Sequence, residues 1–166
     1  IFSKIAKENP DGWLDKSLTA SEIIKVSKSN PLQALPYNKF HCTTWNVNQA
    51  SAMIICSENL ANDLNIPLSK RVYPLASSES NHMIAPIQRP NLSKSYGLDL
   101  AVKFIKGVCR DNDIKPNLYE LYSCFPIAVQ MFGDSLGLSE NQNKTVTGGM
   151  SFAGGPLNNY MIHSTV

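Results

Sequence analysis

The feature that most constrains the fold is a short apolar run at residues 50–56, Ala-Ser-Ala-Met-Ile-Ile-Cys. The run is too short for an ordinary helix and is typical of a strand buried on both faces. Such strands occur in sheets that helices cover on both sides. The run is also about a third of the roughly 20 residues that a membrane-spanning helix needs, so no membrane span is predicted.

Strand-like and helix-like patterns alternate along the rest of the chain. Strands are predicted at 50–56, 71–75, 117–124 and 145–147, and helices at 1–8, after Thr19, after Ser57, at 96–110, from Pro126 to Gly137 and from near Pro156 through His163. This alternation favours the α/β class, with a mostly parallel or mixed sheet covered by helices.

Several predicted helix ends carry recognisable caps. Thr19 is followed three residues later by Glu22, which is the pattern of a capping box. Ser57 is an expected N-cap. Pro126 suits a first helical turn, and Gly137 suits a helix stop.

Composition limits the function classes. A chain of 166 residues with 43% hydrophobic and 17% charged residues is long enough for one domain and too apolar for disorder. The net charge of +2 is too even for a nucleic-acid tail. The N-terminus, residues 1–8, is amphipathic, so no signal peptide is predicted. Because the chain starts at Ile1 and ends at Val166, we expect a piece of a longer protein.

The cysteine pattern indicates a reducing compartment. The four cysteines are spread along the chain without a C-x-x-C motif and without metal-ligand spacing, so no metal site is predicted; they are Cys42, Cys56, Cys109 and Cys124. Reduced, buried thiols are therefore expected, in the cytoplasm or an organelle matrix. The glycosylation sequons at Asn91 and Asn143 are interpreted as chance matches.

Two loops are candidates for chemistry. Residues 120–126, Glu-Leu-Tyr-Ser-Cys-Phe-Pro, form a predicted strand-to-helix turn that brings Cys124 to a helix N-terminus. The helix dipole there favours a thiolate, so Cys124 is a candidate nucleophile or, alternatively, a cysteine packed on the sheet.

The second loop, residues 147–160, contains Gly148, Gly149, Gly154 and Gly155. Backbone N–H groups ahead of a helix can bind an anion or an oxyanion. The loop matches neither a P-loop nor a dinucleotide fingerprint, and tight packing of a helix on the sheet is the alternative. The long polar loop at 77–95, which contains His82, is typical of a functional loop or a lid.

Taken together, these motifs resemble the C-terminal half of the thiolase superfamily. Residues 48–52 are similar to the Asn-Asp-Gly-Ala-Ala-Ala stretch of thiolases, residues 120–125 to Glu-x-Asn-Glu-Ala-Phe, and residues 148–156 to a Gly-Gly loop that ends in Gly-His-Pro. Order and spacing match over residues 35–163. The closest likeness is to divergent thiolase-like proteins often labelled acetyl-CoA acetyltransferase.

The resemblance implies a fold and a domain division. The expected fold is a thiolase-like C-terminal half, with a mixed five-stranded sheet covered by helices and its last strands absent. Residues 1–40 are expected to form a docking lobe and residues 41–166 a partial C-terminal domain.

The resemblance also implies acyl transfer on acyl-CoA or acetyl-CoA thioesters, in lipid metabolism, with coenzyme A as substrate and no covalently bound cofactor. The nucleophilic Cys lies on the N-terminal half of the family's proteins. Tyr122, Ser123 and Gly155 stand where the family has the loop Asn, the loop Glu and the oxyanion His. The catalytic candidates are Tyr122, Ser123, Cys124, Gly155 and His163, and the substrate-binding candidates are Gly148, Gly149, Gly154, Pro156, Asn158 and Asn159.

Some of these candidates have either a functional or a purely structural interpretation. The phenol of Tyr122 could donate a hydrogen bond, and the N–H of Gly155 could partly replace the missing imidazole. His163 is either a relocated histidine or a packed or surface one. His82 could reach a ligand phosphate, and the pair His41-Cys42 is a further, weaker candidate.

Two hypotheses about function follow. In the first, the parent protein is an acyltransferase, and this half supplies the second wall of its active site. In the second, it is a catalytically impaired thiolase-fold module that binds acyl-CoA or a protein partner. The expected partners are the N-terminal half of the parent chain and a second full chain in a homodimer. The fragment alone is expected to be inactive.

Overall fold

The computed structural model describes residues 1–81 and 83–166, so the expectation for His82 lies outside the described residues. The helices in the described ranges are α1 (Phe2–Glu8), α2 (Ala20–Ile24), α3 (Glu58–Asp63), α4 (Tyr96–Asp111), α5 (Pro126–Leu136) and α6 (Tyr160–His163). The strands are β1 (Leu32–Ala34) and β2 (Tyr37–Asn38), and single 3-10 turns lie at η1 (Lys39–His41), η2 (Leu68–Lys70), η3 (Pro86–Gln88) and η4 (Leu157–Asn159).

The predicted helix caps are confirmed. At α2 the hydroxyl of Thr19 accepts from the N–H of Glu22 at 3.2 Å, and the Glu22 carboxylate accepts from the N–H of Thr19 at 2.8 Å. Ser57 caps α3. Pro126 opens α5, and Gly137 ends it at φ 75°. These ends depend on residues within one turn of each other, which is why the sequence pattern could reveal them.

The sheet expectation was wrong for the described residues. Within residues 1–81 and 83–166 the strands form one two-stranded antiparallel sheet, in which Leu32 pairs with Asn38. None of the four predicted strands, at 50–56, 71–75, 117–124 and 145–147, is assigned as a strand, and the expected five-stranded sheet is not found. Helices with this small sheet still fit the α/β class.

The physical reason is that a strand needs a neighbour. Residues 50–56 run without a regular partner strand in the described chain, and Ile54 and Ile55 are 92% and 89% exposed. The side-chain pattern of a buried strand is present, but the backbone ladder and the second apolar layer that bury such a strand are not.

The core lies where α1 meets the segment 148–153. Ala6, Phe152 and Ala153 are buried, and Phe2 is among the side chains that pack against them. Gly148 has φ 105°, and a Cβ there would lie 2.5 Å from the Ala6 backbone, so only glycine allows this approach. The N-terminal residues expected to form a docking lobe therefore share a core with the C-terminal segment.

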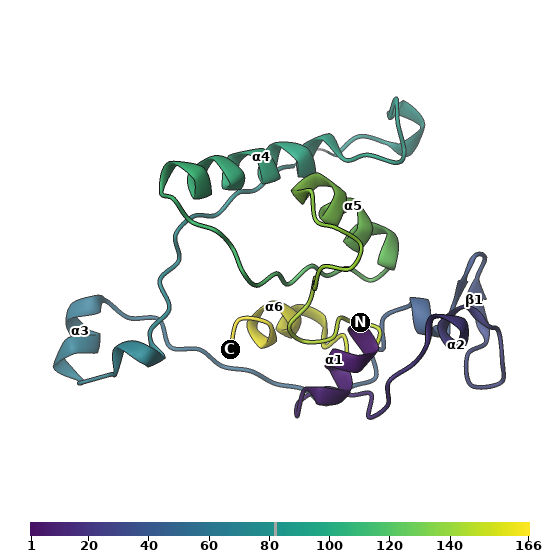
Figure 1. The fold of residues 1–166 in the computed structure, drawn as a ribbon, viewed down its shortest axis with the longest axis horizontal. Helices are drawn as coiled ribbons and strands as arrows, with labels where there is room; N and C mark the ends of the chain where they lie inside the picture. The colour runs from purple at the N-terminus through teal and green to yellow at the C-terminus, as the bar shows by residue number, and fades with distance from the viewer. Residues whose placement is uncertain (82) are drawn as a thin grey trace.

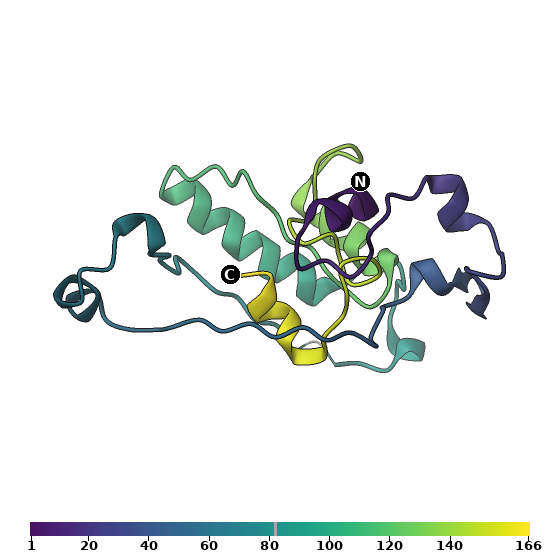
Figure 2. The ribbon, with the colours of Figure 1, turned by 90° about the horizontal axis from the view of Figure 1, so that it is seen from below.

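The remaining elements are arranged around this core. Figure 1 shows α4 beside α5, with α1 and α6 on the other side of α5. The hydroxyl of Ser135 on α5 donates to Asp99 on α4 at 2.7 Å. Both views show α3 standing apart at the end of long extended segments (Figures 1 and 2). Among the described residues, no helix has the length and apolar character needed to cross a membrane.

Candidate functional site

A single carboxylate joins the two loops that the sequence singled out. Glu120, at the start of the first loop, accepts hydrogen bonds from Thr145, Val146, Thr147 and Tyr160. The backbone N–H groups of Val146 and Thr147 lie at 2.7 and 3.0 Å, and the Tyr160 hydroxyl at 2.7 Å. The hydroxyls of Thr145 and Thr147 add bonds of 3.1 to 3.2 Å. Since Thr145, Thr147 and Tyr160 are buried, this carboxylate organises the interior of the site.

The same threonines occupy the N–H groups of the glycine loop. The hydroxyl of Thr145 accepts from Gly148 N–H at 2.9 Å, and that of Thr147 accepts from Gly149 N–H at 3.1 Å. The N–H of Gly155 donates to the Thr44 carbonyl at 2.8 Å. These three N–H groups are therefore engaged within the chain, which disfavours the expectation that they form an oxyanion or anion site.

Tyr122 packs on Tyr160. Their rings stack with centroids 4.5 Å apart and planes at 28°. Tyr160 is 1% exposed, and its hydroxyl also lies 2.7 Å from the hydroxyl of Thr147. Burial, with smaller contributions from the Glu120 charge, raises the pKa of Tyr160 far above its ordinary value. Tyr160 is thus a neutral donor to Glu120, and its ring fixes the plane of Tyr122.

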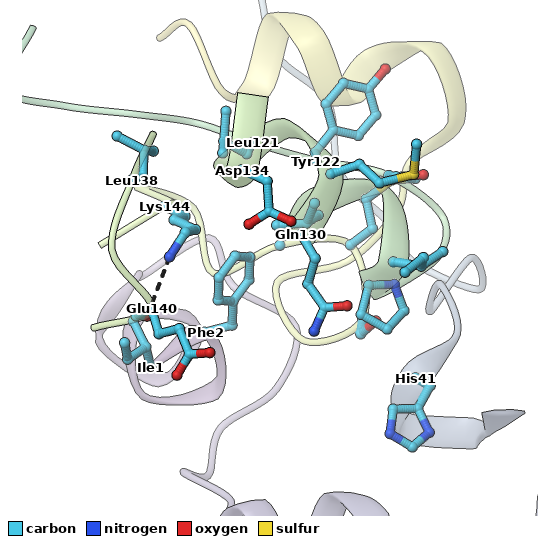
Figure 3. A pocket seen from close by; sticks show the side chains of 18 of the residues that line it. Ile1, Phe2, His41, Leu121, Tyr122, Gln130, Asp134, Leu138, Glu140 and Lys144 are labelled. Atoms are coloured by element: carbon cyan, nitrogen blue, oxygen red, sulfur yellow. Dashed lines mark hydrogen bonds between the residues drawn. The ribbon is translucent and has the colours of Figure 1, made fainter. Parts of the chain in front are cut away.

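An open cleft of about 1070 Å³ lies beside this pair. Its walls come from α1, α5, the 93–99 stretch, the first loop and the turn at 149–152. Figure 3 shows Asp134 and Gln130 of α5 reaching into the space in front of Phe2, with Tyr122 above and Lys144 at one side. The hydroxyl of Tyr122 points away from this space, toward the C-terminal ribbon (Figure 3).

The structure brings some of the predicted site residues to this cleft. Tyr122, Ser123 and Gly149 line it, together with His41. Figure 3 shows His41 at a distance from the other labelled side chains. The Nδ1 atom of His41 accepts from the Asn38 N–H at 3.3 Å, which leaves Nε2 as the ring's proton donor.

Cys124 does not line either large cleft and is exposed. It precedes Phe125, the N-cap of α5, and its carbonyl accepts from the Thr43 hydroxyl at 3.3 Å. All four cysteines are free thiols, and burial raises the pKa of the Cys42 thiol. The role of Cys124 as a nucleophile stays a prediction.

The rest of the glycine loop and its sequel hold the chain together. The side chain of Asn159 accepts from the Ser51 N–H at 3.1 Å and donates to the Gln49 carbonyl at 3.4 Å. Gly154, at φ 115°, lies against the Gln49 side chain, where a Cβ would be 2.5 Å from Oε1. Asn159 and Gly154 therefore fix the start of the extended segment at 50–56, whereas Asn158 is exposed.

His163 belongs to a different place. It lines a second open cleft of about 910 Å³, together with Gln49, Asp11 and Glu8. Its ring lies 6.4 Å from that of Tyr160, and it does not line the cleft beside Tyr122. Pro156 precedes η4 and lines neither cleft. The structure thus separates His163 from Tyr122 and Ser123.

Sequence reasoning missed three residues of the site. Glu120 was predicted only as part of the motif at 120–126. Its role was not predicted, because its partners lie 25 to 40 residues further along the chain. Gln130 and Asp134 lie inside the helix predicted from Pro126 to Gly137, and no motif marks them as site residues. Their spacing of four residues, which places both on one helix face, was the available signal.

Comparisons with known proteins bear on the fold. No family model matches the chain, and no curated protein matches it. Among solved structures, it is similar to a monomeric SCP2-thiolase like protein type 1 from Mycobacterium smegmatis, with a TM-score of 0.78 at 27% identity. The match covers 99% of this chain and 36% of that chain.

This similarity over nearly the whole chain defines a thiolase-like fold, and the chain belongs to the thiolase-like superfamily. The resemblance inferred from the motifs is confirmed at that level. The chain spans about a third of the length of the solved structure, 36%, so the activity and partners of that whole protein do not transfer directly.

Proposed function

We propose that this chain is part of a thiolase-like acyltransferase that acts on acyl-CoA thioesters, and that it supplies one wall of the active site. The observation that carries this proposal is the Glu120 carboxylate. It ties the loop at 120–126 to the loop at 147–160 beside an open cleft, so both motifs of the resemblance meet at one place.

In the proposed reaction a thiolate adds to the thioester carbonyl, the bond from that carbonyl to the sulfur of coenzyme A breaks, and coenzyme A leaves as its thiolate, which takes a proton from solvent. The resemblance assigns that thiolate to a Cys outside this chain. In this chain Ser123 and the ring of Tyr122 line the cleft, where they would hold the substrate close to that thiolate. The N–H groups of Gly148, Gly149 and Gly155 already donate hydrogen bonds within the chain. This wall would therefore bind and orient the substrate, and the donors that stabilise the negative charge on the thioester oxygen would come from elsewhere in the parent protein.

A second candidate is a catalytically impaired module that binds acyl-CoA without turnover. It is favoured by the glycine at position 155, where the resemblance expects an imidazole, and by the engaged N–H groups. Both candidates bind acyl-CoA, and only the acyltransferase converts it. Coenzyme A release and an acyl-Cys adduct in the full-length parent protein would support the acyltransferase, and the absence of both would support the module.

Binding by this chain is the first test. We expect acetyl-CoA titrated into the 166-residue chain to give saturable heat with a Kd below about 1 mM, and no release of coenzyme A. Tyr122→Ala should weaken binding, because it removes a wall of the cleft, whereas Tyr73→Ala, at a 58% exposed tyrosine beside α3, should not. Absence of binding by the unmodified chain would contradict both candidates.

A further inference from the structure

Residues 19–41 form a hairpin lobe, made of α2, β1, β2 and η1, that a buried asparagine ties together. Asn30 is 1% exposed. Its amide nitrogen donates to the carbonyls of Ile23 and Lys25 at 2.9 and 3.0 Å, and its amide oxygen accepts from the N–H of Phe40 at 2.8 Å. These bonds fix the end of α2 against η1, so the lobe presents its outer side chains on a held backbone.

The hairpin lobe has an inner and an outer apolar side. Ile23 and Phe40 pack against the core around Phe152. Four other aliphatic side chains take no part in that core and are 49% to 86% exposed, namely Ile24, Val26, Leu32 and Leu35. Asn38 brings two of them together, because it pairs with Leu32 and donates to the Ile24 carbonyl at 2.9 Å. None of the four lines either large cleft.

The position of this outer side favours a flat partner over one that fills a groove. Leu35 lies in the turn between β1 and β2, and Figures 1 and 2 show α2 and the hairpin projecting beyond α1, away from α4 and α5. A stable protein interface buries about 800 Å² on each partner, more than four side chains on a two-stranded hairpin supply. Insertion of aliphatic side chains into the headgroup region of a lipid bilayer requires only such a projection.

The charge of the hairpin lobe selects the kind of surface. Lys25, Lys28 and Lys39 are exposed, and in the part of the chain that the structure describes their ammonium groups make no ion pair. The one acidic residue of the lobe, Glu22, accepts from the N–H and the hydroxyl of Thr19. The lobe therefore carries the whole net charge of +2, and the rest of the chain has twelve basic and twelve acidic residues. Lysines beside exposed aliphatic side chains match anionic lipid headgroups.

We propose that the hairpin lobe docks this protein on an anionic membrane surface. Leu32 and Leu35 enter the boundary between headgroups and acyl chains, and the three lysines contact the phosphate and carboxylate groups of the lipids. The inference does not use the cleft beside Tyr122 and is independent of the proposed function.

Vesicle sedimentation tests this docking. The 166-residue chain is mixed with vesicles of phosphatidylcholine alone, or with vesicles that also contain about 30% phosphatidylserine. At about 0.1 M salt we expect about tenfold or more stronger partitioning onto the phosphatidylserine vesicles. Most of that difference should disappear at about 0.5 M salt, where charges are screened within a few ångströms. Equal binding to both kinds of vesicle, or binding to neither, would overturn the proposal.

A pair of leucine variants locates the apolar contact. Leu35→Asn should weaken partitioning onto phosphatidylserine vesicles about tenfold, because it removes hydrocarbon from the inserted turn. The matched control is Leu68→Asn, at a 73% exposed leucine of η2, which should bind like the unmodified chain. Since both leucines are exposed, helical circular dichroism should be retained in each variant. Equal losses in the two variants, or no loss in Leu35→Asn, would overturn the proposal.

Lysine variants locate the charged contact. Lys25→Gln and Lys28→Gln, made together, should weaken the partitioning about ten- to thirtyfold, since each lysine near an anionic surface contributes about fivefold. Lys70→Gln and Lys103→Gln, made together at exposed lysines outside the hairpin lobe, should weaken it by less than about threefold. A loss in the control pair as large as that in the lobe pair would overturn the proposal.

Polyglutamate distinguishes a membrane from an acidic protein partner. It offers negative charge without hydrocarbon, so we expect the chain to bind it much more weakly than the phosphatidylserine vesicles. Binding to polyglutamate as strong as that to the vesicles, lost in the Lys25→Gln, Lys28→Gln variant and kept in Leu35→Asn, would assign the hairpin lobe to an acidic protein and overturn the proposal.

Discussion

Glu120 accepts from five donor groups, two of them backbone N–H groups and three of them hydroxyls. Hydrogen bonds to a charged group are worth about twice as much as those between neutral groups. No other described side chain connects segments so far apart in the sequence with so many bonds. At the scale of single residues, the geometry of the site therefore depends chiefly on this one carboxylate.

Glu120→Gln should lower the free energy of unfolding by about 2 to 3 kcal/mol. The amide keeps the size of the side chain, but its NH₂ group faces N–H and O–H donors that the carboxylate had accepted. Urea denaturation at neutral pH measures the loss. The matched control is Glu8→Gln, at an exposed glutamate without a side-chain partner in the described chain, which should change stability by less than about 0.5 kcal/mol. Equal effects of the two variants would contradict the account.

The buried phenol of Tyr160 should make the free energy of unfolding fall at alkaline pH. Burial raises its pKa in the folded protein, so the folded state keeps a proton that the unfolded chain loses near its ordinary pKa of about 10. The stabilisation is therefore fully present below pH of about 10 and declines as the pH rises further. Unfolding free energies between about pH 8 and 11.5 should fall more steeply for the unmodified chain than for Tyr160→Phe. Parallel pH profiles would show that Tyr160 is not held neutral by the fold.

At the scale of elements, helix ends and turns follow from their own residues, and strand pairing does not. Thr19 with Glu22, Ser57, Pro126 and Gly137 all act within one turn of the helix they bound, and the structure has each where the sequence predicted it. The strand expected at 50–56 failed because its existence depends on a neighbour, which no property of these residues supplies. The role of Glu120 could not be predicted for the same reason, because its hydrogen-bond partners are distant in sequence.

Two glycines provide a matched test of the close contact between α1 and the glycine loop. Gly148→Ala should destabilise the chain by about 2 to 4 kcal/mol, because φ is 105° and the new Cβ would lie 2.5 Å from the Ala6 backbone. Gly107→Ala, inside α4 with open space around it, should stabilise by up to about 1 kcal/mol. Thermal melts of both variants measure the difference. A Gly148→Ala variant as stable as the unmodified chain would rule out the close packing of α1 on this turn.

At the scale of the whole molecule, the core of the described chain is confined to the contact between α1 and the segment 148–153. It lies around Ala6, Phe152 and Ala153, while α3 and the segments that lead to it stand apart (Figure 1). The sequence predicted the superfamily from three motifs, and the fold comparison confirms that superfamily. It did not predict the position of the cleft, because the cleft is formed by α1 and α5, which are more than a hundred residues apart.

Hydrogen exchange should reproduce this uneven distribution of order. Backbone amides at 52–56 and 72–75 should exchange at close to the rates of an unfolded chain, since no ladder protects them, while those of α4 and α5 should be slowed. The experiment is repeated at a tenfold lower protein concentration, so that self-association is detected. Strong, concentration-independent protection at 52–56 would mean that these residues pair within one chain, contrary to the structure.

The central claim is that the loops at 120–126 and 147–160 form one acyl-thioester-binding wall. Hydrogen exchange of the chain with and without saturating acetyl-CoA tests it most directly. The account predicts added protection in both loops and in the first turns of α5, with none in α3. Binding of acetyl-CoA that leaves both loops unprotected, or protects only residues around α3, would contradict it.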